Sequence, residues 1–227
     1  MASQAGALPT PTRRAIDLAG YTRADILRAF IDRQMPQFSV TCAVDVTALK
    51  LACVHTGASV FLASSHAVSC AVNAVPALRH RVIDGVLYEY DHTDPGYTVA
   101  REGDLFSFCN GVHLDDFGAY CREARARMAA VQHTPDLSVG EKHHQFFISS
   151  VPWLAFTGFT HPYDAMYAHV PVVTLGKLVD THGRWHMPVA IQVHHGTVDG
   201  VHVARFFEHF TQRCEQASAW LTEGDPP

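Results

Sequence analysis

The sequence predicts a mixed α/β fold: one domain in which a large mixed sheet is packed by helices in a two-layer α+β sandwich. Strand-like apolar runs and segments with helical spacing of apolar residues occur together along the chain. Three of the strand-like runs lie in the C-terminal half: QFFISSV at 145–151, VPVVTLGKLV at 170–179 and WHMPVAIQVHH at 185–195. We expect a single domain over 19–220, a flexible N-terminal arm over 1–18 and a C-terminal tail over 221–227.

The N-terminal half alternates between helical and strand patterns. Apolar residues at helical spacing predict a helix within 21–35, which ends at Pro36, and alternation predicts a strand over 38–49. The small, weakly polar run 57–78 is typical of a helix buried against a sheet and ending near Pro76. Asp84-Gly85 lies between two β-prone runs and predicts a hairpin over 80–90.

Further elements follow this hairpin. GYTVA at 96–100 predicts another strand, and 115–131 predicts an amphipathic helix with Phe117, Cys121 and Met128 inward. A polar turn joins the last two strand-like runs. A final helix should follow Asp199-Gly200, with Val203, Phe207, Phe210 and Cys214 facing the sheet.

Composition narrows the class of protein. A formal net charge of -5 and a pI near 6.3 argue against nucleic acid or an anionic membrane as partner. No apolar run is long enough to span a membrane. The six cysteines are scattered without C-x-x-C spacing, and the N-terminus lacks the pattern of an export signal, so we expect reduced thiols and a cytoplasmic location.

The stretch IQVHHGTVDGVHV at 191–203 contains the candidate chemistry. If the strand alternates without a break, His195 shares a face with Ile191 and Val193 and points into a site shielded from water. A neutral imidazole there can act as a general base. Asp199, at the turn into the last helix, can cap backbone N–H groups and pair with a cation.

Two other interpretations of this stretch remain. The simpler one is a strand end followed by a helix N-cap. The other is a metal site, since His194, His195, Asp199 and His202 are all ligand types. We expect no metal, because adjacent histidines on a strand diverge and no cysteine or glutamate completes an obvious ligand set.

Five segments resemble, in the same order, the type A chloramphenicol acetyltransferases. They are YTRADILRAF, LYEYDHTDPGYTV, FFISSVPWLAFTGF, PVVTLGK and PVAIQVHHGTVDGVHVARFF, and the resemblance runs from about residue 18 to about residue 215. It implies the coenzyme A-dependent acyltransferase fold. It also implies an enzyme that transfers acetyl from acetyl-CoA to the primary (3-) hydroxyl of chloramphenicol in a ternary complex, without an acyl-enzyme, metal or prosthetic group.

The resemblance also assigns roles to residues. His195 is the general base, Ser149 stabilises the oxyanion, and Thr174 steadies the intermediate through water. Arg23 pairs with Asp199 and holds the His195 loop. Four aromatic residues line the acceptor pocket, and one lysine approaches a coenzyme A phosphate; these are Phe30, Phe38, Phe106, Phe108 and Lys177. The implied assembly is a homotrimer with active sites at subunit interfaces.

Some positions depart from the family pattern. Tyr21 stands for tryptophan, Gly196 for alanine and Val198 for cysteine, and the pocket differs at Ala29, Gln34 and Pro36. These departures bear on the choice of acceptor rather than on the type of reaction. A related acyltransferase with another acceptor, dihydrolipoamide or a different xenobiotic, and a non-catalytic drug- or coenzyme A-binding module remain alternatives. We expect the histidines of EKHHQFF and HPYDAMYAH to be surface or interface residues.

Overall fold

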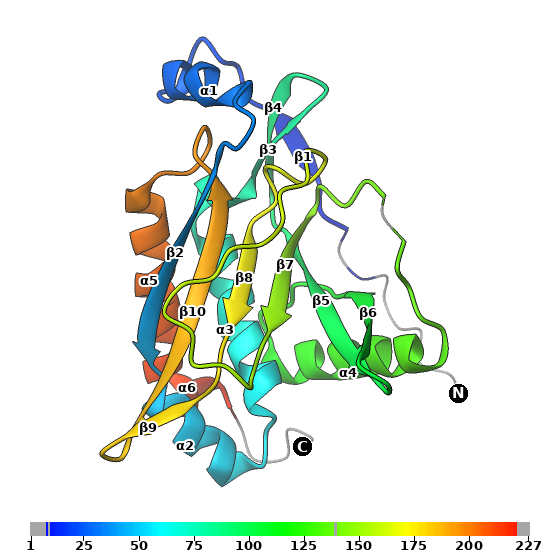
Figure 1. Cartoon of the computed structure of the whole chain (residues 1–227), viewed down its shortest axis with the longest axis vertical. Helices are drawn as coiled ribbons and strands as arrows, with labels where there is room; N and C mark the ends of the chain where they lie inside the picture. The colour runs from blue at the N-terminus through cyan, green and yellow to red at the C-terminus, as the bar shows by residue number, and fades with distance from the viewer. Residues whose placement is uncertain (1–7, 9, 139, 222–227) are drawn as a thin grey trace.

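The computed structural model describes residues 8, 10–138 and 140–221. Its largest feature is a seven-stranded mixed sheet (Figure 1). Six strands follow the order β2-β10-β8-β7-β5-β6, and β9 pairs with the far end of β10. Their bounds are β2 Gln37–Asp45, β5 Asp94–Arg101, β6 Leu105–Asn110, β7 Gln145–Ser150, β8 Val172–Leu175, β9 Val179–Thr181 and β10 Arg184–His194.

The sheet is parallel only in its centre. β7 is parallel to β5 and to β8, whereas β10 is antiparallel to β2 and β8, and β6 is antiparallel to β5. In this register Ser149 of β7 pairs with Thr174 of β8, and Thr174 pairs with Ala190 of β10. The predicted mixed sheet is therefore present.

A smaller three-stranded sheet lies at one end of the molecule, in the order β1-β4-β3. β3 (His80–Ile83) and β4 (Val86–Tyr90) form the predicted hairpin. Asp84 and Gly85 have φ values of 50° and 76°, as a tight two-residue hairpin turn requires. β1 (Arg13–Ala15) pairs with β4, so part of the N-terminal segment adds an edge strand. Residues 1–7 and 9 of the expected arm, and 222–227 of the expected tail, lie outside the described residues.

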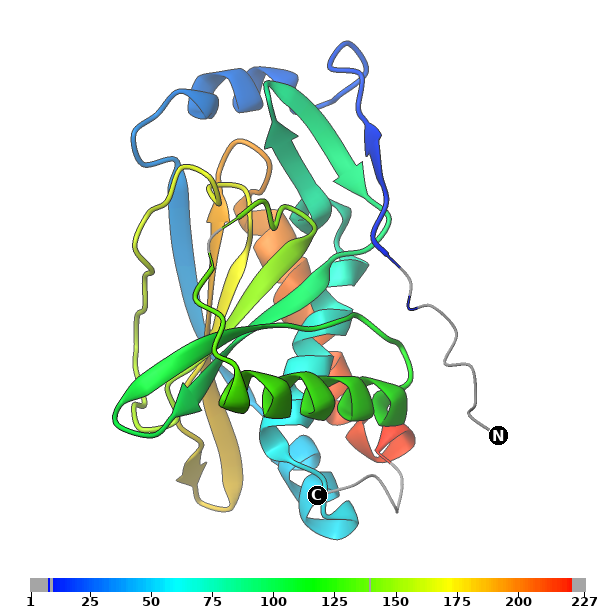
Figure 2. The same cartoon turned by 90° about the vertical axis from the view of Figure 1, so that its right-hand side faces the viewer.

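Helices cover one face of the large sheet, and the long connection 151–171 crosses the other (Figures 1 and 2). Helices α3 and α5 pack against each other under the sheet, and α4 contacts β5 and β6. The helices are α1 Ala24–Ile31, α2 Thr47–Thr56, α3 Val60–Ala74, α4 Phe117–His133, α5 Gly200–Glu215 and α6 Ala217–Trp220, with a short 3-10 helix, η1, over Pro76–Arg79.

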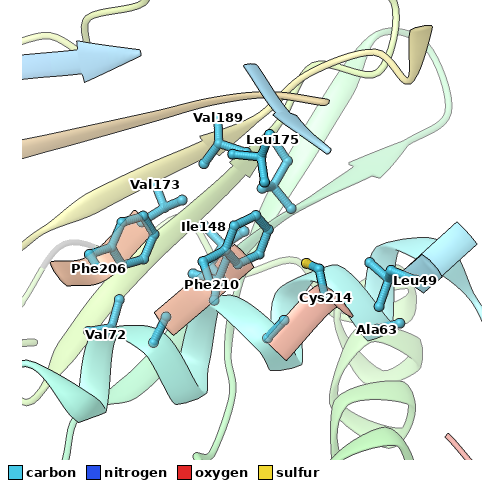
Figure 3. Close-up of a cluster of buried hydrophobic side chains, with 14 of the residues drawn as sticks. Leu49, Ala63, Val72, Ile148, Val173, Leu175, Val189, Phe206, Phe210 and Cys214 are labelled. Carbon is cyan, nitrogen blue, oxygen red and sulfur yellow. The ribbon is translucent and has the colours of Figure 1, made fainter. Parts of the chain in front are cut away.

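The hydrophobic core lies between the sheet and these helices (Figure 3). Ile148, Val173 and Val189 point down from three neighbouring strands, and Phe206 and Phe210 rise from α5 to meet them. All five side chains are fully buried or nearly so. The alternation that buries them leaves Ser149, Thr174 and Gln192 on the opposite, helix-free face of the sheet.

The strand predicted over 38–49 ends early, at Asp45, and α2 begins at Thr47. The Asp45 carboxylate accepts hydrogen bonds from the backbone N–H of Thr47 at 2.9 Å and from its hydroxyl at 2.5 Å. This local turn gives the backbone an alternative to the sheet ladder, so the apolar alternation beyond Asp45 does not continue as strand.

Two further expectations need correction. The run 170–179 is not one strand, because β8 ends at Leu175 and β9 starts at Val179, with Gly176 between them. On α5, Phe206 rather than Phe207 is fully buried, because the inward stripe follows spacings of three, four and four from Val203.

Among the residues that the structure describes, no helix combines the length and the hydrophobicity needed to span a bilayer.

Candidate active site

His195 lies just beyond the last residue of β10, where the chain turns toward α5. Its backbone N–H donates to the carbonyl of Pro36 at 2.9 Å. Its Nδ1 lies 3.2 Å from the Val198 carbonyl oxygen. A carbonyl can only accept, so Nδ1 carries the proton and Nε2 of the neutral ring keeps a lone pair. The turn thus presents an imidazole that can take a proton at Nε2.

Two aromatic rings confine this imidazole. Phe30 of α1 lies 4.3 Å from the His195 ring, and Phe38 of β2 lies 5.0 Å from it, measured between ring centroids. His195 is nevertheless half-buried in the single chain rather than enclosed. The sequence predicted a site shielded from water, whereas the His195 ring in this chain is only partly shielded.

Arg23 and Asp199 hold the turn that carries His195. Arg23 Nη1 lies 3.3 Å from Asp199 Oδ2, and Arg23 Nη2 donates to the His195 carbonyl oxygen at 3.2 Å. Asp199 is the N-cap of α5 and accepts from the Gly200 N–H at 2.7 Å. The Gly200 N–H, and then Arg23, hold the pKa of Asp199 below its usual range. One carboxylate therefore starts α5 and anchors the arginine that contacts the His195 backbone.

His194 supports the same turn from the opposite face of β10. Its ring is buried and stacks on His169 with centroids 3.8 Å apart, and its Nδ1 accepts from the Gly196 N–H at 3.0 Å. Burial, with His195 nearby, lowers the pKa of His194 to about 4, so it is neutral near pH 7 and can accept this hydrogen bond. Adjacent histidines thus have different tasks, because the pleat sends them to different surroundings.

A cavity of about 330 Å³ opens on the helix-free face of the sheet. It lies between β5, β6 and β7 and the connection 151–171, and it is lined by Ser149, Phe108, Lys142, Gln37, His161 and Gln192 among others. Its volume is at the lower end of the range for small-molecule sites. Phe106, 46% exposed, lies beside Phe108 with ring centroids 5.6 Å apart. Ser149 and Phe108, two predicted site residues, therefore share one cavity.

Thr174 is fully buried and does not itself line the cavity, but its Oγ1 lies 2.6 Å from Nε2 of the lining residue His161. The backbone N–H of His161 donates to Gln192 Oε1 at 2.8 Å. His161, expected from the sequence to be a surface or interface residue, is thus a partly buried lining residue of the cavity, and its place at an interface stays a prediction. The connection 151–171 has no helical or strand periodicity that could have indicated this contact.

His195 and Ser149 are far apart within one chain. Ser149 is two strands away from Ala190 of β10, and His195, just beyond the end of β10, lies five positions further along the chain. With about 4.8 Å between strands and about 3.3 Å per residue, their Cα atoms are roughly 19 Å apart. The predicted site residues therefore lie in two separate groups within one chain: Arg23, Asp199 and His195 with Phe30 and Phe38, and Ser149 and Thr174 with Phe108. Lys177 is exposed and does not line the cavity.

No group of three or more histidine, cysteine, aspartate or glutamate side chains within 8, 10–138 and 140–221 is arranged to hold a metal ion. All six cysteines are free thiols. The group around His195 can transfer a proton, and the group around Ser149 can donate a hydrogen bond to a developing anion.

The family model for chloramphenicol acetyltransferase matches residues 12–211. Together with the mixed sheet and its helical layer, this match defines an acyltransferase. Two curated relatives named chloramphenicol acetyltransferase 2, from Escherichia coli and Haemophilus influenzae, are each 32% identical to this chain; each alignment covers 88% of this chain and 96% of the relative. The chain belongs to the chloramphenicol acetyltransferase family.

Solved structures agree with this assignment. A chloramphenicol acetyltransferase, 27% identical, superposes with a TM-score of 0.84 and covers 89% of this chain and 100% of its own. The cubic core of the pyruvate dehydrogenase multienzyme complex has a TM-score of 0.64 at 18% identity, covering 88% of this chain and 89% of that chain. The second likeness shows a shared fold alone.

Proposed function

We propose that this protein transfers the acetyl group of acetyl-CoA to the primary hydroxyl of chloramphenicol in a ternary complex. Family membership supports the reaction. The observation that carries the mechanism is the contact between His195 Nδ1 and the Val198 carbonyl, because it leaves Nε2 available as the base.

In this mechanism Nε2 of His195 takes the proton of the primary hydroxyl as its oxygen attacks the thioester carbonyl. The tetrahedral oxyanion accepts a hydrogen bond from Ser149, and Thr174 steadies it through water. Collapse of the intermediate breaks the carbon–sulfur bond, and the imidazolium returns the proton to the departing thiolate. The products are the acetyl ester and free coenzyme A.

The active site in this proposal is completed by a second copy of the chain. His195 and Ser149 lie roughly 19 Å apart in one chain by the strand geometry. A cyclic homotrimer would bring the His195 end of one subunit to the Ser149 cavity of its neighbour and form three identical sites. The same contact would cover the partly exposed His195 ring. We also propose that the enzyme works in the cytoplasm, where acetyl-CoA is available.

Release of coenzyme A, separated from the acceptor and quantified by chromatography because dihydrolipoamide carries thiols of its own, tests the reaction. The chain is expected to release coenzyme A from acetyl-CoA with chloramphenicol, and not with dihydrolipoamide. His195→Ala should lower turnover by at least several orders of magnitude while acetyl-CoA still binds. Turnover with dihydrolipoamide alone would support an acyltransferase with that acceptor, and no turnover with either compound would support a binding module.

Mixed assemblies test the shared site. Subunits carrying His195→Ala and subunits carrying Ser149→Ala are each expected to be nearly inactive. When the two are unfolded together and refolded as a mixture, some interfaces regain an intact His195 and an intact Ser149, so activity should rise well above either parent. Activity that stays at the level of the parents, in an assembly shown to be mixed, would contradict a shared site.

A further inference from the structure

One hydrogen bond of a cavity-lining residue has no part in the mechanism above. His161 Nε2 lies 2.6 Å from Thr174 Oγ1, a short hydrogen bond between an imidazole and a hydroxyl. His161 comes from the connection 151–171, and Thr174 from β8, so the bond joins this connection to the sheet. His161 and Ser149 line the same cavity.

A chain of amides holds His161 in position. Its backbone N–H donates to Gln192 Oε1 at 2.8 Å, and Gln192 Nε2 donates to Gln37 Oε1 at 2.8 Å. Gln37 Nε2 in turn donates to the Ala168 carbonyl oxygen at 2.9 Å. The segment before β8 is thus attached at both ends to strands β10 and β2, which fixes the imidazole relative to Thr174.

The direction of this hydrogen bond decides where the Thr174 proton points. A threonine hydroxyl has one proton to donate and can also accept. Burial lowers the pKa of His161, so its ring is neutral near pH 7 and has one proton, on Nε2 or on Nδ1. With Nε2–H, the imidazole donates and Thr174 is free to donate elsewhere. With Nδ1–H, Thr174 must donate to Nε2.

The neighbour that would benefit from a free Thr174 proton is the oxyanion site. Thr174 and Ser149 are register partners on adjacent parallel strands, and both side chains lie on the helix-free face. A hydroxyl that donates on this side adds a second donor, directly or through water, where negative charge develops.

We propose that His161 is a positioning residue: it donates its Nε2–H to Thr174 Oγ1, so that the Thr174 hydroxyl is free to donate on the helix-free face of the sheet, toward its register partner Ser149. The catalytic benefit rests on the proposed function, whereas the hydrogen-bond direction does not. His161 therefore acts on the reaction through Thr174 and makes no contact with the reacting atoms.

Imidazole ¹⁵N NMR of the full chain tests the direction without any turnover. The His161 resonances are assigned as those that disappear in His161→Gln. They are expected to show the Nε2–H tautomer, and Thr174→Val is expected to shift the His161 Nε2 signal. An Nδ1–H tautomer in the unchanged chain would overturn the inference.

Steady-state kinetics tests the effect on the reaction. His161→Leu and Thr174→Val are each expected to lower kcat about tenfold, with KM for chloramphenicol changed less than about twofold, and the double variant should be no slower than either single one. His161→Gln, which keeps an Nε2 donor, should recover most of the lost kcat. Losses that multiply in the double variant, or no recovery with glutamine, would contradict the inference.

The two tests separate this inference from the proposed function. An unchanged chain that acetylates chloramphenicol but has His161 as Nδ1–H overturns the inference alone. A chain with the Nε2–H tautomer and no turnover with chloramphenicol overturns the proposed function and supports the hydrogen-bond direction.

Discussion

Acid should destabilise this protein through buried neutral histidines. His66, His80 and His194 are 0%, 9% and 2% exposed, and burial is the first cause that lowers the pKa of each to about 4. In the unfolded chain each would titrate near its ordinary value of about 6.5. Between pH 6.5 and pH 4 the unfolded chain therefore binds more protons than the folded one, and stability falls as the pH falls.

The expected loss is large. At pH 5.0 each of these three histidines lowers the free energy of unfolding by about 2 kcal/mol relative to pH 7.5, and the three together lower it by about 6 kcal/mol. Small domains have only about 5–15 kcal/mol of unfolding free energy. Urea denaturation followed by circular dichroism at pH 7.5, 6.0 and 5.0, at a fixed protein concentration, measures this loss above the range where most carboxylates titrate.

A single substitution isolates one contribution. The His66 ring packs near Tyr120 and Trp220 and makes a 3.1 Å hydrogen bond with the Leu114 carbonyl. His66→Phe loses that hydrogen bond at every pH, but it also removes one buried group that can bind a proton. The fall in the free energy of unfolding between pH 7.5 and pH 5.0 should therefore be smaller by about 2 kcal/mol. His209→Phe, at an exposed position of α5, is the matched control for placing a phenyl ring where a histidine stood. Equal pH dependence in His66→Phe and the unchanged chain would refute this reasoning.

Three further substitutions test the site and the packing. Asp199→Asn keeps a helix cap but loses the charge that faces Arg23 at 3.3 Å. The free energy of unfolding should fall by about 1 kcal/mol or less, whereas turnover should fall about tenfold or more. Turnover equal to that of the unchanged chain would argue against an anchoring role for Asp199. Gly176→Ala would place a Cβ 2.5 Å from a proline ring and should cost about 1–3 kcal/mol in urea denaturation, whereas Gly158→Ala, with nothing within 4 Å, should cost far less. Phe210→Ala, in the core and fully buried, should lower the free energy of unfolding by about 3–5 kcal/mol, and a loss below 1 kcal/mol would contradict the packing described above.

Periodicity predicted the elements that face the core. The hairpin at Asp84-Gly85, the buried helix ending before Pro76 and the strand that ends beside His195 are all present, because each has a strong local pattern. Predictions were wrong where a single side chain redirects the backbone. Asp45 ends a strand with a local turn that residue alternation does not reveal.

In the candidate site too, local motifs predicted some residues and missed others. Arg23, Asp199 and His195 lie in two short motifs, and the structure brings them together. His161 could not be predicted, because its contact with Thr174 depends on how a connection without periodicity crosses the sheet. The chain has 16 histidines, and nothing in the sequence distinguished His161 from the others as a residue of the site. Long-range placement of loops is the information that local patterns lack.

Asp199 both caps α5 and pairs with Arg23, and this affects how the activity of distant relatives should be inferred from their sequences. An aspartate that begins α5 is worth about 1 kcal/mol to the helix even in a protein that has lost its chemistry. Its retention in a newly sequenced homologue is thus weak evidence for an active enzyme. Loss of the arginine at position 23 or the histidine at position 195 is more informative, because neither side chain caps α5.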